Sequence, residues 1–209
     1  MKILNPRVAE DIQAGRGLRL NLGSGLRRRD GFYGVDHVAL PRLDILADLN
    51  EPLSELPDNC VDEIYCRHVL EHVARLLELL AELHRVTRQG GRIEIVVPHF
   101  SNPYGYSDPT HVRFFGLYSF YYFCDAEDQP LRKVPDFYLP QRFTVESVRC
   151  RLLGKSLPEK LLRWLLQPWI NRGPAWLDWY ERRWCRLAPA SDIRYVLRPK
   201  KEHMARSET

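Results

Sequence analysis

"LRLNLGSGLRRRDGFYGVD", residues 18–36, is the stretch that decides the fold of this chain. Its first part, 18–22, predicts a short strand that ends in the turn Gly23–Gly25, and 31–36 predicts a second strand that ends in Asp36. A glycine turn after a first strand lets backbone N–H groups approach a ligand closely, and an acid that ends the second strand can accept from ribose hydroxyls. The stretch therefore indicates a nucleoside-binding sheet.

The turn departs from the dinucleotide-binding pattern in two ways. Arg28 stands where the motif G-x-G-x-x-G requires its third glycine. Asp36 comes 11 residues after Gly25, whereas dinucleotide folds place their ribose-binding acid about 20 residues further on. Because a full helix hardly fits into so short a connection, an NAD or nucleotide-sugar enzyme is only an alternative.

The rest of the chain continues the strand pattern. A helix is predicted over 74–91 from its apolar face. Apolar runs predict further strands at 43–49, 61–68, 92–100, from 144 onward and over 192–200, with antiparallel pairing open for the last. Strands that alternate with helices or loops are typical of the α/β class. We predict a Rossmann-like, doubly wound, mostly parallel seven-stranded sheet with C-terminal helices.

Residues 100–143 interrupt this pattern, because they are rich in Pro, Gly and aromatic residues and lack a sustained period. Long ordered loops in compact domains usually carry function. We predict a lid or acceptor insertion here, inside a single domain over 1–209 with a solvated tail over 200–209. Half or more of its aromatic residues are expected in ordinary packing, and the others would wall an acceptor pocket: Tyr104, Tyr106, Phe114, Phe115, Tyr118, Tyr121 and Tyr122.

Charge is unevenly distributed along the chain. The formal net charge is +4, but 151–186 holds eight Lys or Arg against three Asp or Glu. A nucleic-acid-binding protein usually shows a wider basic footprint, so we expect no nucleic acid partner.

The five cysteines are an odd number and widely spaced, and no leader or membrane-spanning run is visible. These features favour free thiols and a cytoplasmic location.

All five tryptophans fall within 164–184, inside a segment over 158–187 that we predict to be helical and basic. Trp and Arg on an amphipathic helix suit a membrane interface, where the protein would reach a lipid-linked acceptor. A helical pair that packs on the sheet, or contact with a second copy in a homodimer, explains the same composition. We favour packing or a dimer and keep peripheral membrane contact as the alternative.

The stretch "HVLEH", residues 68–72, has the H-x-x-E-H order of a zinc peptidase. Such a site needs both histidines on one continuous helix, while His68 directly follows a predicted strand. A third ligand is also required, and Glu78 and Glu82 are candidates without a distinguishing spacing. We therefore expect no metal site. The alternative is a zinc-dependent hydrolase that uses His68, Glu71 and His72.

Several motifs carry a family resemblance when they are taken in order: "LNLGSG", "GVD", "ILADLNEPL", "VDEIYCRHVLEHV", "GGRIEIVVPHF" and "SDPTHVRFF". Together they resemble the class I S-adenosylmethionine-dependent methyltransferases, in particular the type 11 group with a very short first connection. The resemblance spans roughly residues 18–115, and "PASDIRYVLRP" resembles the closing strand of the same group. It implies a methyltransferase with S-adenosylmethionine as its cofactor.

The resemblance also implies which residues hold the cofactor. The turn Gly23–Gly25 would face the methionine part, Asp36 the ribose hydroxyls, and Asp48 the adenine edge. The full implied set is Leu22, Gly23, Ser24, Gly25, Asp36, Asp48, Leu49, Arg67 and His68. The chain departs from the wider class because most of the first helix is missing and "RRRD", residues 27–30, fills the gap.

Methyl transfer from a sulfonium chiefly requires alignment of the reactants and exclusion of water. A hydroxyl acceptor is helped by a base, for which "SDPTHVR" offers Asp108 and His111, with His99 as a third candidate. An Asx-type turn at Asp108 beside a structural His111 explains the same residues equally well. The resemblance favours a small-molecule or saccharide-type (glycan) acceptor. A non-catalytic module that only binds the cofactor is a further alternative.

Overall fold

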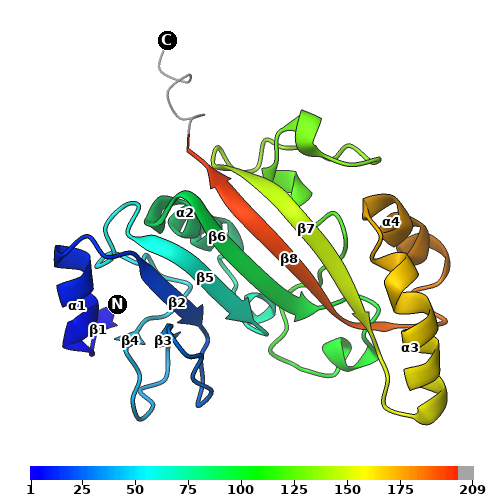
Figure 1. The fold of residues 1–209 in the computed structure, drawn as a ribbon, viewed down its shortest axis with the longest axis horizontal. Coiled ribbons are helices and arrows are strands. Elements are labelled where there is room, and N and C mark those ends of the chain that lie inside the picture. Colours follow the sequence, from blue (N-terminus) through cyan, green and yellow to red (C-terminus); the bar gives the residue numbers. More distant parts are fainter. Residues whose placement is uncertain (202–209) are drawn as a thin grey trace.

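One twisted sheet runs through the whole molecule in the computed structural model, which describes residues 1–201 (Figure 1). The strand order is β1-β4-β3-β2-β5-β6-β8-β7. The strands are β1 Lys2–Ile3, β2 Leu18–Leu22, β3 Tyr33–Asp36, β4 Ile45–Leu46, β5 Val61–Arg67, β6 Thr87–Pro98, β7 Arg142–Leu152 and β8 Ala190–Lys200. The helices are α1 Pro6–Gln13, α2 Leu76–Val86, α3 Leu157–Ile170 and α4 Pro174–Arg183. Short 3₁₀ turns are η1 Leu70–His72, η2 Pro103–Tyr106, η3 Tyr121–Phe123 and η4 Ala126–Asp128.

The mostly parallel α/β sheet is confirmed. β4, β3, β2, β5 and β6 pair in parallel, and β8 is antiparallel to both β6 and β7. The strand count is eight rather than seven, because Lys2–Ile3 adds an antiparallel edge strand on β4. A strand of two residues is too short to show the alternation of apolar and polar residues from which strands are predicted.

The boundary between α2 and β6 differs from the prediction. The helix ends at Val86 instead of continuing to the glycine pair, and β6 already begins at Thr87. Gly90 has φ 76, and a Cβ at Gly91 would lie 2.5 Å from Thr87 Cγ2, so both positions require glycine. The two glycines therefore shape an irregular strand start, where the β5–β6 register shifts, and do not cap the helix.

Helices cover the two faces of the sheet unequally. The connections over 23–32, 37–44 and 47–60 contain no helix, whereas α2 follows β5 and lies on one face (Figure 1). Side chains alternate along β6, so the buried Ile93 and Ile95 point to one face and Arg92 and Glu94 to the other. The second face is therefore left open over the middle of the sheet.

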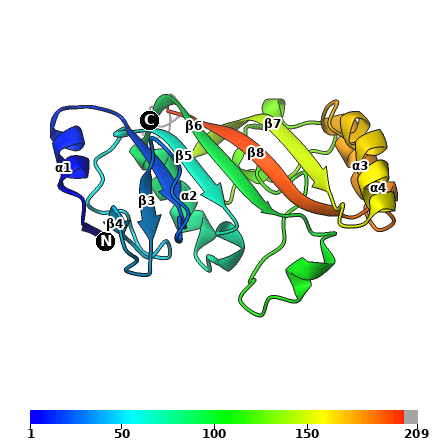
Figure 2. The same cartoon turned by 60° about the horizontal axis from the view of Figure 1, so that its bottom comes forward.

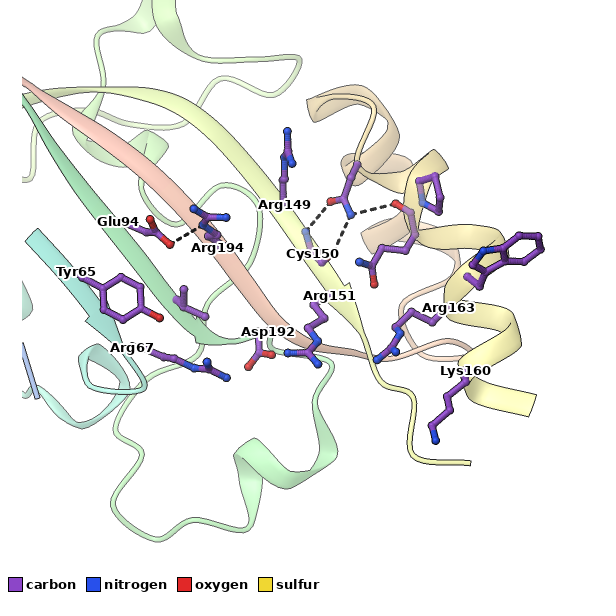
Figure 3. A pocket seen from close by; sticks show the side chains of 15 residues that line it. Tyr65, Arg67, Glu94, Arg149, Cys150, Arg151, Lys160, Arg163, Asp192 and Arg194 are labelled. Atoms are coloured by element: carbon purple, nitrogen blue, oxygen red, sulfur yellow. Dashed lines mark hydrogen bonds and ion pairs between the residues drawn. The ribbon is translucent and has the colours of Figure 1, made fainter. Parts of the chain in front are cut away.

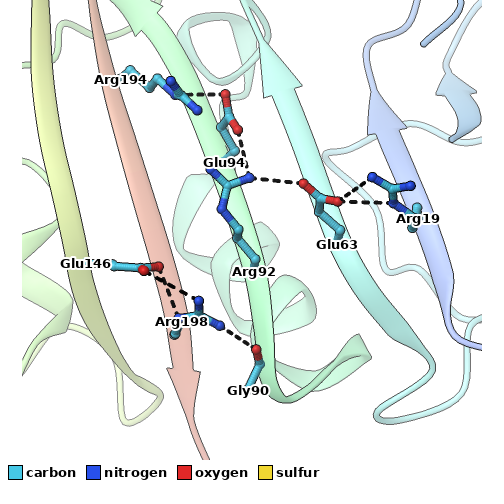
Figure 4. A network of polar contacts seen from close by, with 8 residues as sticks. All are labelled: Arg19, Glu63, Gly90, Arg92, Glu94, Glu146, Arg194 and Arg198. Atoms are coloured by element: carbon cyan, nitrogen blue, oxygen red, sulfur yellow. Dashed lines mark hydrogen bonds and ion pairs between the residues drawn. The ribbon is translucent and has the colours of Figure 1, made fainter. Parts of the chain in front are cut away.

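A ladder of ion pairs runs across this open face (Figure 4). Glu63 on β5 binds Arg19 of β2 at 2.8 Å and Arg92 of β6 at 3.0 Å. Glu94 on β6 binds Arg92 at 2.9 Å and Arg194 of β8 at 2.8 Å. Single exposed ion pairs contribute about 0–1 kcal/mol, and a connected network is worth more. The ladder lets charged side chains occupy a face that helices cover elsewhere in α/β folds.

The predicted lid divides into two parts. Its second half packs on the sheet, where buried Phe115 and Phe120 stack at 5.9 Å and Phe120 meets Tyr195 of β8 at 4.6 Å. Its first half, with η2, projects beyond the sheet at the end of β6 (Figure 2). Tyr104, Tyr106 and Phe114 are at least half exposed. Only the first half therefore extends away from the sheet.

Helices α3 and α4 lie beside β7 at the far edge of the sheet (Figure 1). Ser156 and Glu159 form a capping box that begins α3. Asn171 accepts from the Cys150 N–H at 2.8 Å and donates to the Cys150 carbonyl at 2.8 Å, so the outer edge of β7 is satisfied by side-chain contacts. No helix in the described part of the chain could span a membrane. Of the predicted tail, 202–209 lies outside the described residues, and Lys200 still belongs to β8.

Candidate functional site

A cavity of about 480 Å³ opens at the carboxyl ends of β2, β3 and β5. Its size lies in the range of roughly 300–1,000 Å³ that is usual for ligand sites, and its position is where α/β sheets bind ligands. The lining residues are Gly23, Asp36, His37, Ala47, Asp48, Leu49, Asn50, His68, Val69, His72, Val73 and Thr110. We call it the cofactor cavity.

The turn after β2 must be glycine where it meets the segment after β5. Gly23 has φ 60, a left-handed backbone conformation that side chains disfavour. A Cβ at this position would lie 2.1 Å from Val69 Cγ2. The bare backbone at Gly23 therefore forms one wall of the cofactor cavity.

Asp36 links the second strand to this turn. The carboxylate is 8% exposed; Oδ2 accepts from the Gly25 N–H at 2.9 Å and Oδ1 from the Val38 N–H at 3.1 Å. Each carboxylate oxygen has two lone pairs, so two acceptor positions remain after these contacts. The side chain is therefore fixed at the cavity wall, and its remaining acceptor positions could take hydrogen bonds from the hydroxyls of a diol.

Asp48 and Asn50 form the opposite wall. Asp48 Oδ1 accepts from the Asn50 N–H at 2.9 Å and from Asn50 Nδ2 at 3.0 Å. The backbone contact from Asn50 is the main reason that the pKa of Asp48 is lowered, so the carboxylate is charged at neutral pH. Asn50 Oδ1 in turn accepts from the Ala74 N–H at 2.8 Å, which ties this loop to the start of α2.

His68 stands between two carboxylates at the end of β5. Its Nε2 lies 3.2 Å from Asp192 Oδ1, and its Nδ1 lies 3.4 Å from Oε1 of the buried Glu71. The hydrogen bond with Asp192, followed by that with Glu71, raises the pKa of His68 to about 9. His68 is therefore a cation at neutral pH and supplies the countercharge for Glu71.

A hydrogen-bond relay reaches the cavity from the lid. The Val112 N–H donates to the Glu71 carbonyl at 2.9 Å, which holds the segment around Val112 against η1. Thr110 Oγ1 donates to Asp108 Oδ1 at 2.6 Å, because a carboxylate cannot donate. Thr110 Oγ1, 2.8 Å from His72 Nδ1, then accepts from that ring nitrogen. In the neutral ring, Nε2 then carries the lone pair.

Of the three predicted catalytic residues, Asp108 and His111 lie together, with His111 Nε2 3.7 Å from Asp108 Oδ2, and His99 lies apart from them. Asp108 lies outside the cofactor cavity but ends the relay, and hydrogen bonds from Thr110 lower its pKa. His111 donates from Nδ1 to the Gly105 carbonyl at 2.8 Å, because a carbonyl oxygen only accepts, and its ring meets His72 edge-on at 4.8 Å. His99 is buried between Ser101 and Glu181 and does not line this cavity.

The implied cofactor residues are also only partly brought together. Gly23, Asp36, Asp48, Leu49 and His68 share the cofactor cavity. Leu22 is fully buried in the sheet, and Ser24 and Gly25 face a small hollow on the other side of the turn. Arg67 lines a separate cavity on the open face of the sheet. Sequence reasoning considered His72 only as a possible zinc ligand and missed its pairing with Thr110, which lies 38 residues away in the sequence.

The zinc trio His68, Glu71 and His72 is not assembled. His68 leaves β5 with φ 53 and turns to Asp192. In the described residues, the possible metal ligands that do gather are Glu71, His72 and His111, whose ligating atoms lie within 4.8 Å of one another. Ligands of a tetrahedral zinc at about 2.1 Å lie about 3.4 Å apart, so this looser group would have to contract around an ion.

Comparison with known proteins is consistent with this site. Residues 35–95, which span β3 to β6, match the family model described as a methyltransferase domain. No curated protein matches the chain. The YcgJ protein from Bacillus subtilis has a similar structure at TM-score 0.51 and 13% identity, over 92% of this chain and 97% of that one, which shows a common fold.

Two further solved structures give TM-scores just under one half. They are a SAM-dependent methyltransferase from Archaeoglobus fulgidus (0.47, 20% identity, 93% and 92% of the two chains) and a putative methyltransferase from Bacillus halodurans (0.49, 14%, 94% and 99%). The methyltransferase-domain match covers 35–95 only, and it falls on a sheet whose cavity lies at the carboxyl ends of the strands, an arrangement that is similar to the class I, S-adenosylmethionine-dependent methyltransferases.

Proposed function

We propose that this enzyme methylates a hydroxyl of a small-molecule or saccharide-type acceptor, with His72 as the general base. The observation that carries the proposal is the place of His72 on the wall of the cofactor cavity, with Nδ1 fixed by Thr110 so that Nε2 is the ring nitrogen left to accept a proton. A positioned base of this kind contributes about 10²–10⁴-fold to the rate.

The cofactor fits the residues present. Gly23 offers bare backbone, Asp36 has acceptor positions for a diol, and Asp48 faces the same cavity with a charged carboxylate. Bound here, S-adenosylmethionine supplies an electrophilic methyl group on a sulfonium. The chain would orient the acceptor oxygen toward that methyl and exclude water, and His72 Nε2 would take the hydroxyl proton as the methyl passes from sulfur to oxygen.

His68 has a different role in this scheme. Because its pKa is raised to about 9, it is protonated near neutral pH and cannot act as the base. Its positive charge instead fixes Glu71 and Asp192 around the cavity.

The function is tested by titrating the protein with S-adenosylmethionine and its demethylated product, followed by methyl-transfer assays on a panel of sugars and small hydroxyl compounds. We expect binding of both cofactor forms, and we expect His72→Gln to abolish transfer while it leaves their affinity unchanged. Unchanged transfer in His72→Gln would remove the base from the proposal. A chain that binds the cofactor but methylates nothing in the panel would fit a binding module.

We also propose that the outer surface of α3 and α4 rests on a membrane that carries anionic lipids. The five tryptophan residues are 42–73% exposed, and the rings of Trp169, Trp176, Trp179 and Trp184 form a continuous row with centroids 5.8–6.3 Å apart. Amphipathic aromatic rings with nearby cations suit the level of lipid headgroups. Contact with a second copy of the chain is the competing outcome.

A further inference from the structure

A second and larger cavity, about 860 Å³, lies on the open face of the sheet (Figure 3). It is bounded by β5, β6, β8 and β7 on one side and by α3 on the other. It exists because no helix covers this face and because α3 stands beside β7. We call it the basic cavity, after six of its lining residues: Arg67, Arg149, Arg151, Lys160, Arg163 and Arg194.

The positive charge in this cavity is mostly uncompensated. Its two acids, Glu94 and Asp192, are already engaged: Glu94 binds Arg92 and Arg194, and Asp192 binds His68 and also attracts Arg67 without a direct ion pair. Within the described part of the chain, no carboxylate forms an ion pair with any of the other five cations, which are Arg67, Arg149, Arg151, Lys160 and Arg163. An ordinary solvated surface intersperses charges of both signs.

These cations converge from three separate elements. Arg67 comes from the end of β5, Arg151 from the end of β7 and Arg163 from α3, and Figure 3 shows them in a row along the rim with Asp192 between the first two. Like charges that gather in a concave site repel one another, and an anion in their midst removes that repulsion. Guanidinium groups bind phosphate oxygens through paired hydrogen bonds, which makes phosphate the anion best matched to this site.

The basic cavity and the cofactor cavity share a wall. Arg67 lines the first and the next residue, His68, lines the second. His68 Nε2 is 3.2 Å from Asp192 Oδ1, and Asp192 faces the basic cavity. A molecule whose anionic group lies among the arginines therefore has its neighbouring groups within reach of the methyl-transfer site.

We propose that the basic cavity binds the phosphate or diphosphate group of the methyl acceptor. This inference rests on the proposed function and narrows the acceptor to a phosphate ester or diphosphate ester. Trp164, which is 73% exposed on the wall of the cavity, offers an aromatic surface to the group that the phosphate carries.

The test is calorimetric titration with inorganic pyrophosphate at constant ionic strength. We expect the wild type to bind, and the double variant Arg151→Gln/Arg163→Gln to bind at least about tenfold more weakly, because charge-assisted hydrogen bonds are lost. The matched control is Arg183→Gln/Arg186→Gln, which removes the same charge from exposed positions outside the cavity and should bind like the wild type. No binding by the wild type, or equal weakening in both double variants, would overturn the proposal.

The same samples separate this proposal from the proposed function. Each variant is also titrated with the demethylated cofactor, which should bind equally in all of them. Normal cofactor binding without pyrophosphate binding refutes only the basic cavity, whereas a wild type that ignores the cofactor refutes the methyltransferase function. Two further arms distinguish the source of the phosphate: a soluble nucleoside diphosphate, and phosphatidylcholine vesicles with and without phosphatidic acid. Competition of either with pyrophosphate supports the site, and competition of neither contradicts it.

Discussion

His68 Nε2 lies 3.2 Å from Asp192 Oδ1, and this pair divides the cofactor cavity from the basic cavity. The strand β8, which brings Asp192, runs antiparallel to β6, so its first residues meet the carboxyl ends of the parallel strands. The pair is thus a direct product of the strand order. It sets the charge at the place where acceptor and cofactor would meet.

His68 should titrate far above an ordinary histidine. Its pKa is raised from 6.5 to about 9, first by Asp192 and then by Glu71. Because the folded pKa exceeds the unfolded one, the stabilisation is fully present below pH 6.5 and is lost as pH rises through about 9. NMR titration of the ring should show this, with a lower pKa in Asp192→Asn; a wild-type pKa near 6.5 would contradict it.

Gly23 and Gly25 should respond differently to alanine. Both have positive φ, but a Cβ at Gly23 lies 2.1 Å from Val69 Cγ2 whereas a Cβ at Gly25 meets nothing within 4 Å. Gly25→Ala should cost about 1–2 kcal/mol of unfolding free energy from backbone strain alone. Gly23→Ala should cost more and also weaken cofactor binding. Denaturant unfolding and calorimetry measure the two effects, and equal behaviour of the variants would argue against close approach at Gly23.

The relay to His72 should depend on the hydroxyl of Thr110. Thr110→Val removes the acceptor for His72 Nδ1, and we expect kcat to fall by about tenfold or more while cofactor affinity stays the same. Thr110→Ser keeps the hydroxyl and should retain most of the activity. The pH profile of kcat should also change in the valine variant only. Similar loss in both variants would mean that Thr110 matters only for packing.

The tryptophan surface of α3 and α4 should bind anionic vesicles. Co-sedimentation at low salt is expected with phosphatidylglycerol-containing vesicles and should weaken as salt is raised, because the Debye length shortens. Trp164→Ser/Trp169→Ser should reduce pelleting more than Phe137→Ser, which changes an aromatic residue 75% exposed between η4 and β7. A protein that stays in the supernatant and sediments as a dimer would assign this surface to a second copy.

Much of the fold could be predicted because strands leave local signals. Apolar runs located β2, β3, β5 and β6, and the 11-residue gap between Gly25 and Asp36 already excluded a helix there. The open face was not predicted, although Arg92 and Glu94 alternate with Ile93 and Ile95 in a way typical of a one-sided strand. The predicted doubly wound sheet would have helices on both faces of this strand.

The site was harder to predict, because its parts meet only in three dimensions. Gly23, Asp36 and Asp48 each end or follow a parallel strand, so their convergence follows from the sheet. The contact of His72 with Thr110 depends on how the segment after η2 packs against η1, and no local sequence pattern predicts that packing. The basic cavity likewise requires β5, β7 and α3 to be placed side by side, and arginines scattered along a sequence do not reveal that.

The most direct test of the central claim is calorimetric titration of the wild type, Asp36→Ala and the exposed control Asp30→Ala with the demethylated cofactor. The account predicts that the wild type and Asp30→Ala bind with equal affinity, and that Asp36→Ala loses at least about tenfold, since it removes the carboxylate held by the Gly25 and Val38 N–H groups at the cavity wall. Equal affinity in all three proteins, or none in the wild type, would contradict it.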